Sequence, residues 1–556
     1  MATHREQPRF ATREPVDFVV VGSGAAGGVM AKELAEAGFD VVVLEQGPYL
    51  RQEDFGHDEL AHIFHQEWFG GREGEHPQTF RRTDEEDAEV MDFLPPLIYA
   101  RMVGGSSVHY TANYWRFHEV DFIERSLLGP LSGTGFADWP ITYDDLDPYY
   151  TKVDWEIGVS GAPGPHDPPR SRPYPVPPLP IKSSGAILEK GARELGLNPF
   201  PAPMAILSQP YNGRPGCIHC GFCLAFGCEV GAKSSTLAAM IPQAEATGRC
   251  EIRSESTVFR LDTDDAGRIS EVVYWDRDGH EQAQQARAVV LCANGAETAR
   301  LLLMSESSRF PDGLANASGL VGKYLMFNGL SFAYGLFDHP LNEYKGVQVT
   351  RVLHDFYASD PARGFYGGGG IDARFFPGSP IWFALGTLPP DAPTWGAEYK
   401  RMLGEYYTRT VAINGHTTSL PLETNTISLD PTVKDKWGRP ALRVTYKDHP
   451  DDLATMQFLL DRSMEILEAA GAKRIWQAPV TETTLAAHLL GTCRMGNDPA
   501  ESVVDRYHRA HDVPNLFICD GSSFVTSGRG QPTMTIQALA FRAADHLIEF
   551  AQRGEI

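Results

Sequence analysis

The chain has 556 residues, which is enough for two or three domains' worth of core. Hydrophobic residues make up 42 % and charged residues 22 %, which is the composition of a soluble globular protein. The formal net charge of −23 argues against nucleic acid or an anionic membrane surface as a partner. No run of about eighteen apolar residues predicts a transmembrane helix, and the start, MATHREQPRF, lacks the apolar core of a secretion signal.

The N-terminal segment carries the pattern of a dinucleotide-binding fold. Asp17 to Val21 is an apolar, β-branched run typical of a buried strand. The pattern G-x-G-x-x-G follows, then a helical pattern over 29–37, and then a second strand that ends in an acidic residue. The glycines allow a tight turn and close approach to a pyrophosphate, and the acid accepts hydrogen bonds from ribose hydroxyls. The pattern alone leaves NAD and FAD open, and its residues are Gly22, Gly24, Gly27 and Glu45.

Four cysteines lie within twelve residues in the run CIHCGFCLAFGC, whereas only four others are spread over the rest of the chain. The spacing C-x2-C-x2-C-x4-C can gather several thiolates round one point, which predicts an iron–sulfur cluster. Two disulfides or a structural zinc site are the alternatives. A cluster in a catalytic chain implies that electrons leave singly towards a protein acceptor. The first three cysteines, Cys217, Cys220 and Cys223, are separated by two residues each and supply three ligands. The fourth, Cys228, either is the fourth ligand or lies beside a three-iron cluster.

Beyond these motifs the chain reads as interleaved segments. Nine prolines between Pro163 and Pro180 predict an extended crossing segment. Residues 320–480 are strand-rich, in runs such as GLSFAYGLF and IWFALGTL, and a helical stretch follows near Leu453 to Ala470. The C-terminal part contains NLFICDGSS, a strand that ends in Asp520, and then a long helix from Met534 to Phe550.

Five blocks of the sequence, in the same order, resemble the glucose–methanol–choline (GMC) family of FAD-dependent oxidoreductases. The blocks are VVVGSGAAGG…VVVLEQG, RMVGGSSVHYTANYWR, AVVLCANGAETARLLLMS, HLLGTCRMG and CDGSSFVTSGRGQPTMTIQALAFRAADHL. The resemblance implies an α/β fold, in which a Rossmann-like FAD-binding domain is interleaved with a sheet-based substrate domain. Within the family, the cysteine run before GAKSST is similar to bacterial sugar and gluconate dehydrogenases. Those enzymes work as complexes with a small subunit and a cytochrome.

The resemblance divides the chain into segments. A tail (1–16) precedes three parts of the FAD-binding domain (17–120, 251–319 and 481–556), the last of which carries the active site. Between them lie a flavin cover with the proline-rich crossing and the cysteines (121–250) and the substrate-binding domain (320–480).

The resemblance also implies roles for single residues. His488, in the pattern H-x-x-G-T, stands where the family has its catalytic histidine, and an imidazole can accept the hydroxyl proton near neutral pH. Gln531 stands where the family has His or Asn, which is a departure that puts the placement of the alcohol in doubt. His109 either bonds covalently to the flavin or lines it without a bond. The remaining implied flavin contacts are Gly104, Gly105, Ser106 and Asp520.

Together these features predict an FAD-dependent dehydrogenase that oxidises a hydroxyl of a sugar, glycoside or sugar acid. Hydride passes to the flavin, and electrons pass through the cluster to a cytochrome-type acceptor. One alternative is an oxidase that uses oxygen, with structural cysteines, and another is a flavin electron-transfer subunit without a substrate. Similar dehydrogenases are exported with a small subunit that bears a twin-arginine signal. The expected location is therefore the periplasm, with the cytoplasm as the alternative.

Overall fold

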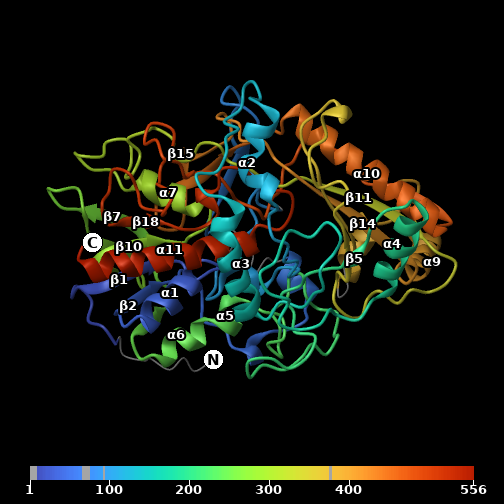
Figure 1. The fold of residues 1–556 in the computed structure, drawn as a ribbon, viewed down its shortest axis with the longest axis horizontal. Coiled ribbons are helices and arrows are strands. Elements are labelled where there is room, and N and C mark those ends of the chain that lie inside the picture. Colours follow the sequence, from blue (N-terminus) through green and yellow to red (C-terminus); the bar gives the residue numbers. More distant parts are fainter. Residues whose placement is uncertain (1–8, 65–74, 92–93, 375–378) are drawn as a thin grey trace.

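The computed structural model describes residues 9–64, 75–91, 94–374 and 379–556, and shows two sheet-based halves joined along the long axis (Figure 1). One half is built on a five-stranded parallel sheet in the order β18-β10-β1-β2-β6. This sheet draws its strands from three distant stretches of sequence: β1 (Val16–Val21), β2 (Val41–Leu44), β6 (Cys250–Arg253), β10 (Ala286–Leu291) and β18 (Leu516–Ile518). The predicted α/β fold is confirmed.

Helices cover the parallel sheet because its strands are apolar on both faces. Residues of β1 and β10 pair in register from Val16 with Ala286 to Val21 with Leu291, and their side chains are almost wholly buried. The surrounding helices are α1 (Gly27–Glu36), α3 (Tyr143–Ile157), α5 (Thr236–Ala239), α6 (Ile241–Ala246) and α11 (Thr533–Arg553). A three-stranded antiparallel sheet and one further helix lie at the edge of this half: β7 (Thr257–Thr263), β8 (Ile269–Trp275), β9 (Glu281–Gln284) and α7 (Glu297–Met304).

The other half is built on a six-stranded sheet in the order β17-β11-β14-β13-β12-β5. Its strands are β5 (Phe200–Pro201), β11 (Leu330–Leu336), β12 (Arg351–Leu353), β13 (Gly369–Arg374), β14 (Thr410–Thr417) and β17 (Arg474–Gln477). Alternate residues such as Ile371 and Ile413 point to α4 (Ser183–Glu194) and α10 (Pro450–Ala470), which form an apolar core on one face.

The opposite face of this sheet is divided. Tyr334 and Ala412 pack against α8 (Pro380–Gly386) and α9 (Gly396–Tyr406). Further along β13 and β14 the same face carries Asp372, Asn414 and His416, all buried, on the side towards the nucleotide-binding half. A polar patch inside a sheet core is costly, so its position suggests a functional reason.

Two details differ from the sequence-based expectation. IWFALGTL is not a strand; it forms helix α8, because Pro380 occupies the first helical position and a short apolar run has no strand-specific period. The strands β15 (Thr426–Lys434) and β16 (Pro440–Thr445) do not join the six-stranded sheet. They form a separate sheet with β3 (Gln78–Arg81) and β4 (Glu89–Val90).

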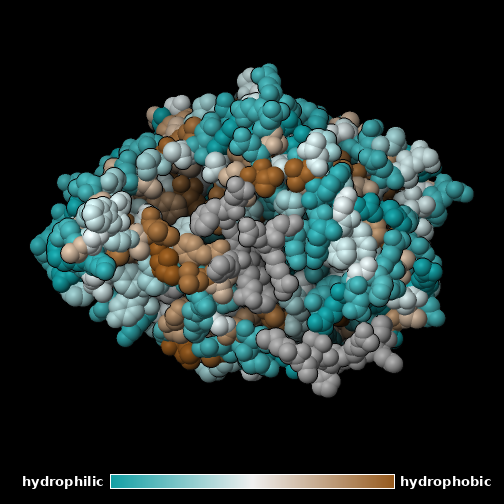
Figure 2. All heavy atoms as spheres, turned by 180° about the vertical axis from the view of Figure 1, so that it is seen from behind, coloured by the Kyte–Doolittle hydropathy of each residue, from teal (hydrophilic) through white to brown (hydrophobic). Residues whose placement is uncertain are grey.

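The remaining helix, α2 (Glu119–Leu128), lies between the two halves. In the parts of the chain that are described, no helix is both long and apolar enough to cross a bilayer. The face opposite to that of Figure 1 is mainly hydrophilic, with hydrophobic residues gathered round a hollow (Figure 2).

Candidate active site

The glycine loop after β1 forms one end of a cavity. Gly22 has a φ of +91°, and a Cβ there would lie 2.6 Å from the carbonyl oxygen of Cys292. A Cβ on Gly27 would lie 1.9 Å from the carbonyl oxygen of Gly22, so this glycine lets α1 start directly against the loop. Gly24 faces the cavity. A Cβ on Gly105 would lie 2.8 Å from the Cα of Gly24. The two glycine-rich loops therefore meet backbone to backbone.

Glu45 ends β2 beside this loop, where its carboxylate is held by three donors. Oε2 accepts from the backbone N–H of Ser23 at 3.0 Å and from its hydroxyl at 2.7 Å, and Oε1 accepts from Gly47 N–H at 3.0 Å. Burial raises the pKa of Glu45, while these hydrogen bonds oppose the rise. The side chain lines the cavity in a fixed orientation, as a ribose-binding acid requires.

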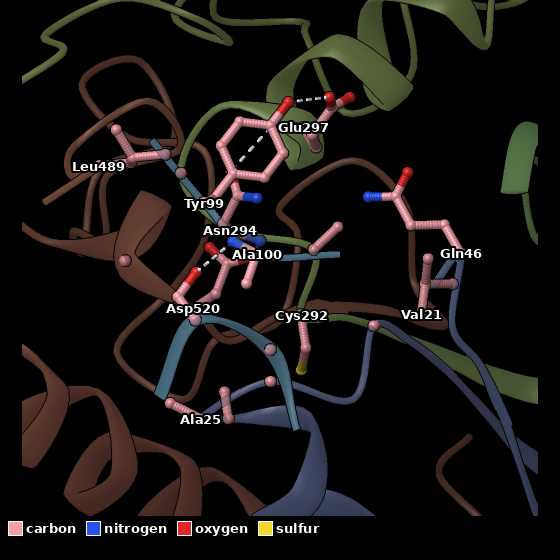
Figure 3. A pocket seen from close by; sticks show the side chains of 18 of the residues that line it. Val21, Ala25, Gln46, Tyr99, Ala100, Cys292, Asn294, Glu297, Leu489 and Asp520 are labelled. Atoms are coloured by element: carbon pink, nitrogen blue, oxygen red, sulfur yellow. Dashed lines mark hydrogen bonds between the residues drawn. The ribbon is translucent and has the colours of Figure 1, made fainter. Parts of the chain in front are cut away.

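Asp520 faces the cavity from the end of the segment that follows β18 (Figure 3). One carboxylate oxygen accepts from Asn294 N–H at 3.0 Å and from the Thr298 hydroxyl at 2.6 Å. The other accepts from the N–H of Ser522 at 2.8 Å and from its hydroxyl at 2.6 Å. Asp520 thereby joins the segments after β10 and β18, and burial raises its pKa.

The loop of residues 104–109 covers this cavity. Gly104 has a φ of +92° and donates its N–H to the Ser23 hydroxyl at 3.1 Å, while Gly105 and Ser106 line the cavity. His109 lies behind the loop, with Nε2 3.1 Å from Sδ of Met102, and burial lowers its pKa to about 3. Its covalent or non-covalent contact with the flavin stays a prediction.

His488 lies at the far end of the same cavity. Its segment is held on both sides by backbone bridges, Ala486 with Leu97 and Leu490 with Met326. Nδ1 of His488 lies 2.9 Å from Oδ1 of Asn328. The Asn328 amide nitrogen donates to the carbonyl oxygens of Thr417 at 2.9 Å and Gly528 at 3.2 Å, so Oδ1 is the acceptor.

This contact decides the tautomer of His488. Because Oδ1 of Asn328 can only accept, Nδ1 carries the proton and Nε2 keeps a lone pair. Burial, the largest effect, and the charges of His416 and Arg374 lower the pKa of His488, whereas a hydrogen bond with Gln531 opposes the lowering; together these effects leave the pKa at about 3. At neutral pH the ring is therefore a neutral proton acceptor.

Gln531 lies between His488 and the polar patch of the six-stranded sheet. Its amide nitrogen is 3.1 Å from Nδ1 of His416. A Cβ on the preceding Gly530 would lie 2.4 Å from the Trp115 ring, so this glycine lets the loop and the indole pack closely. Trp115 in turn packs edge-on against His416, with ring centroids 5.3 Å apart.

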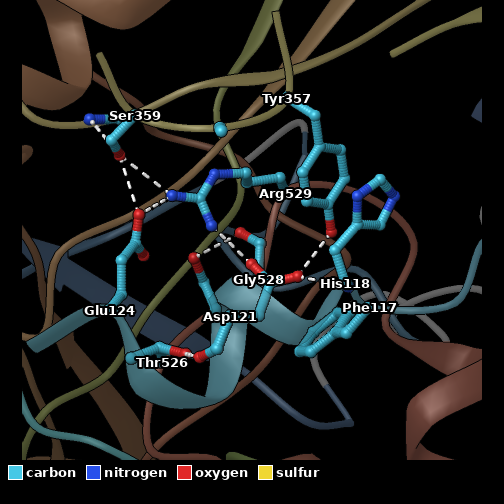
Figure 4. Close-up of polar contacts among 12 residues, drawn as sticks. Phe117, His118, Asp121, Glu124, Tyr357, Ser359, Thr526, Gly528 and Arg529 are labelled. Carbon is cyan, nitrogen blue, oxygen red and sulfur yellow. Dashed lines mark hydrogen bonds and ion pairs between the residues drawn. The ribbon is translucent and has the colours of Figure 1, made fainter. Parts of the chain in front are cut away.

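A buried ion cluster anchors the loop that carries Gln531 (Figure 4). Arg529 is fully buried and donates to Asp121 at 2.5 Å, to Glu124 and, at 2.9 Å, to the Ser359 hydroxyl. The Tyr357 hydroxyl donates to Asp121 at 2.6 Å. The cluster thus ties the C-terminal loop both to α2 and to the segment after β12.

The cysteine loop lies behind residues 104–110 rather than in the cavity. Ala225 N–H donates to the His109 carbonyl oxygen at 2.8 Å, and buried Lys233 donates to the carbonyl oxygens of Tyr110 and Phe226 at 3.1 and 2.8 Å. Backbone N–H groups also point at two sulfurs, from His219 to Cys217 at 3.3 Å and from Lys233 to Cys228 at 3.4 Å. The loop is therefore packed directly on the segment that the sequence assigns to the flavin.

The geometry of a metal centre is not found at these cysteines. All eight cysteines are free thiols, and among the described residues no group of three or more His, Cys, Asp or Glu side chains is arranged to hold a metal ion. Burial raises the pKa of Cys223 to about 12 and that of Cys217 to about 11, and neighbouring cysteines add to both shifts. The thiols of the run are thus close enough to affect each other's pKa. They do not have the cluster-binding arrangement that the spacing predicts.

Residues 16–326 and 421–540 match the N-terminal and C-terminal profiles described as GMC oxidoreductase. The chain belongs to the GMC oxidoreductase family. It is 36 % identical to 2-methyl-1,2-propanediol dehydrogenase of Mycolicibacterium austroafricanum, over 96 % of this chain and 95 % of that protein. It is 29 % identical to the gluconate 2-dehydrogenase flavoprotein of Pantoea cypripedii, over 96 % and 94 % of the two chains.

Two further similarities concern another dehydrogenase and the fold. The chain is 28 % identical to the fructose dehydrogenase large subunit of Gluconobacter japonicus, over 97 % of this chain and 98 % of that protein. Among solved structures, pyridoxine 4-oxidase superposes with a TM-score of 0.66 at 18 % identity, over 96 % of this chain and 99 % of that one. The GMC fold is thereby confirmed.

As a GMC oxidoreductase the chain is an FAD-dependent enzyme that acts on alcohol or sugar CH–OH groups. The cavity fits this cofactor. It extends from the glycine loop, at Gly22 and Gly24, to His488. Glu45 and Asp520 line it with carboxylates, and the glycine loops at Gly24 and Gly105 leave backbone facing it.

Sequence reasoning brought together most of the cavity, but it missed the residues that orient the GMC active site. Asn328, Asp372 and His416 belong to the substrate-domain sheet or to its edge, far in sequence from His488 and Gln531. A signal was present in GGIDAR and TVAINGHT, where polar residues recur at every second position of otherwise apolar strands.

Proposed function

We propose that this GMC oxidoreductase is a dehydrogenase that oxidises one hydroxyl of a sugar, glycoside or sugar acid to a carbonyl. The observation that carries the proposal is the position of His488, whose unprotonated Nε2 lies where the flavin cavity meets a polar sheet face. A polyhydroxylated substrate suits this face, because the amide oxygen and nitrogen of buried Asn414 have no hydrogen-bond partner among the described residues and can meet a hydroxyl.

The reaction needs a proton acceptor and a hydride acceptor. Bound FAD supplies the hydride acceptor. Nε2 of His488 takes the hydroxyl proton as the carbon loses its hydride, and Asn328 keeps the opposite nitrogen protonated throughout. After the transfer both ring nitrogens carry protons, and Gln531 can accept from the new N–H.

A small 1,2-diol is a second candidate for the substrate, favoured by the 36 % identity to 2-methyl-1,2-propanediol dehydrogenase. The three dehydrogenases named above act on a diol, on gluconate and on fructose. These compounds share a carbon–hydroxyl group next to a second hydroxyl. The two candidates therefore differ in size and polarity rather than in chemistry.

We also propose that the cysteine loop holds an iron–sulfur cluster that passes electrons to a cytochrome-type acceptor. The donor set suits it, since four thiols lie in one loop and two of them already accept backbone N–H groups. Two non-glycine residues of the loop, His219 and Ala225, adopt positive φ values of 57° and 70°, a backbone conformation that is uncommon outside glycine and often marks a functional segment. The four thiols would have to move together to hold the cluster.

The proposed partners and location follow from the same similarity. One relative is named as a large subunit, which supports a complex with a smaller subunit. We propose export to the periplasm together with such a signal-bearing partner. Fractionation of cells that express the chain with and without its partner tests this, and active enzyme in the periplasm without a partner would contradict it.

The central experiment is anaerobic stopped-flow reduction of the holoenzyme by D-gluconate, D-fructose, methyl glucoside and 2-methyl-1,2-propanediol. At least one compound should bleach the flavin, and His488→Ala should slow bleaching by roughly 10²–10⁴-fold while FAD stays bound. His280→Ala, at an exposed histidine, is the matched control and should behave as wild type. Failure of all four compounds would reject the substrate class, and fast peroxide formation in air would favour the oxidase.

A further inference from the structure

His416 connects Gln531 to a buried carboxylate. It lies on β14, and its side chain is only 2 % exposed. Nδ1 of His416 is 3.1 Å from the amide nitrogen of Gln531, and Nε2 is 2.8 Å from Oδ2 of Asp372. The chain Asp372–His416–Gln531 therefore leads from the core of the substrate-domain sheet to the residue beside the base.

The contacts assign the protons along this chain. An amide nitrogen can only donate, so Nδ1 of His416 accepts from Gln531 and the ring proton lies on Nε2. Oδ2 of Asp372 accepts that proton, as well as a hydrogen bond from the Asn113 amide at 2.9 Å. The histidine is thus held as the Nε2–H tautomer by the carboxylate behind it.

Burial and the neighbouring Arg374 favour a neutral His416. Arg374 donates to Asp372, from Nε to Oδ1 at 2.8 Å and from Nη2 to Oδ2, and its Nη2 also lies 2.8 Å from Nε2 of His416. Because Nη2 can only donate and Nε2 carries the ring proton, this last contact is not a hydrogen bond, and Asp372 is the acceptor for Nη2. Burial is the largest effect on the pKa of His416 and lowers it; the Asp372 carboxylate raises it and the Arg374 cation lowers it, and the pKa is lowered overall. A neutral ring offers Gln531 an acceptor, whereas an imidazolium would offer a donor and turn the amide round.

The orientation of Gln531 decides what His488 meets. With the Gln531 nitrogen committed to His416, its carbonyl oxygen is left for His488. That oxygen cannot donate to Nε2 and so does not compete for the lone pair that must take the substrate proton. Once Nε2 is protonated, the oxygen can accept from it, and the hydrogen bond stabilises the imidazolium.

We propose that His416, held by Asp372, is a positioning residue that fixes the Gln531 amide with its carbonyl oxygen towards His488. The proposal rests on the proposed function, in which His488 is the base. It also accounts for the glutamine at this position, because the longer side chain lets the amide bridge two histidines. A purely structural role would not require an Asp–Arg–His group inside a sheet, where buried charges are often replaceable by apolar residues.

The first test is a double-mutant cycle in the full-length holoenzyme. His416→Leu and His416→Asn are made in the wild-type and Gln531→Leu backgrounds, and flavin reduction by D-gluconate and by 2-methyl-1,2-propanediol is followed anaerobically. We expect His416→Leu to lower the limiting rate about 10- to 100-fold with a nearly unchanged substrate dissociation constant. His416→Asn retains an acceptor near Nδ1 and should recover most of the rate.

Coupling to Gln531 separates positioning from packing. If His416 acts only through Gln531, His416→Leu causes no further loss in the Gln531→Leu background. Equal losses in both backgrounds, or a wild-type rate in His416→Leu, would overturn the proposal. Melting temperatures and flavin content of all variants show whether a loss is one of folding.

The second test needs no turnover, and so separates this proposal from the proposed function. Holoenzyme labelled with ¹⁵N-histidine is examined by NMR, and the His416 signal is assigned by its loss in His416→Leu. We expect a neutral ring protonated on Nε2 from about pH 7 to about pH 8, above the ordinary pKa of histidine, because the pKa of His416 is lowered. An imidazolium or an Nδ1–H ring in this range would refute the assignment, even if another substrate class proved correct.

Discussion

His488 places Nδ1 2.9 Å from Oδ1 of Asn328, and the two residues lie 160 positions apart in the sequence. Asn328 is itself oriented, since its amide nitrogen donates to the carbonyl oxygens of Thr417 and Gly528. A carbonyl oxygen held in this way accepts a hydrogen bond from Nδ1–H of His488 and cannot donate one. The catalytic face of the imidazole is therefore set by an amide from the edge of the substrate-domain sheet.

Replacing Asn328 should cost catalysis without removing the base. In Asn328→Leu the ring can take either tautomer and can rotate, so we expect the limiting rate of flavin reduction to fall about 10²-fold. Asn328→Asp keeps an acceptor at the same place, and this variant should stay closer to wild type than Asn328→Leu. A Leu variant within about twofold of wild type would show that Asn328 does not set the tautomer.

The pH dependence of flavin reduction should have its acid limb well below neutrality. The pKa of His488 is lowered to about 3, first by burial and then by the charges of His416 and Arg374. The reaction requires neutral His488, so the rate should rise with pH through that value and be flat from about pH 5 to about pH 8. Stopped-flow reduction with pH jumps measures the limiting rate, and an acid limb near 6.5 would show an unshifted histidine.

The sequence predicts the nucleotide-binding half well because its signals are local. The strand Val16–Val21, the glycines and Glu45 follow one another within thirty residues, and each has a fixed place in the motif. His488 and Asp520 could be placed by resemblance to the family. Their positions on one cavity with Gly22 and Gly24 agree with that assignment.

The same approach could not find the orienting residues, because nothing local marks them. Asp372 and His416 become neighbours only through the register of β13 with β14, in which Asp372 pairs with Asn414 and Gly370 with His416. Strand pairing across forty residues is set by packing of the whole sheet rather than by a motif. The strand prediction for IWFALGTL was wrong for a related reason, because a short apolar run fits a buried strand as well as a helix.

Arg529 should be needed for folding as well as for placing Gln531. It is fully buried with two carboxylates, so Arg529→Met leaves both without their cation, and breaking such a group costs about 3–5 kcal/mol. Arg401→Met is the control, because Arg401 also pairs with two carboxylates but is exposed. Thermal denaturation should show a clear fall for Arg529→Met only, and equal melting temperatures would contradict this account.

Buried neutral histidines should make the protein lose stability in acid. His508 has a pKa lowered to about 3 by burial, below the 6.5 of an unfolded chain, so the unfolded state binds one more proton between these values. Its contribution is present above pH 6.5 and is lost as the pH falls, by about 1.4 kcal/mol per pH unit. His508→Asn tolerates the left-handed backbone at φ 68° and retains a donor for the Ile518 carbonyl oxygen.

The measurement is denaturant unfolding of the holoenzyme at several pH values between about 4 and about 7. The slope of unfolding free energy against pH should be smaller in His508→Asn by roughly one proton. An identical slope in both proteins would mean that His508 is protonated in the folded state, or that its pKa is not lowered.

The cysteine run is tested by separating flavin reduction from electron delivery. The cysteine loop is hydrogen-bonded to the carbonyl oxygen of His109, so electrons that leave the flavin loop towards it would have a short path. If a cluster forms there, Cys220→Ser should remove iron while FAD stays bound, since the flavin cavity is lined by other segments. Flavin bleaching by substrate should persist, whereas reduction of a cytochrome should collapse, because the cytochrome accepts electrons singly.

Cys250→Ser is the control, since Cys250 is a free thiol like Cys220 but lies on β6, away from the run. It should keep iron and cytochrome reduction. Iron, zinc and acid-labile sulfide are measured in wild type and both variants. Stoichiometric zinc without iron, or full cytochrome reduction by Cys220→Ser, would reject the cluster. The four cysteines would then be structural thiols, in agreement with the lack of a metal-holding group among the described residues. Oxygen would become the electron acceptor to test.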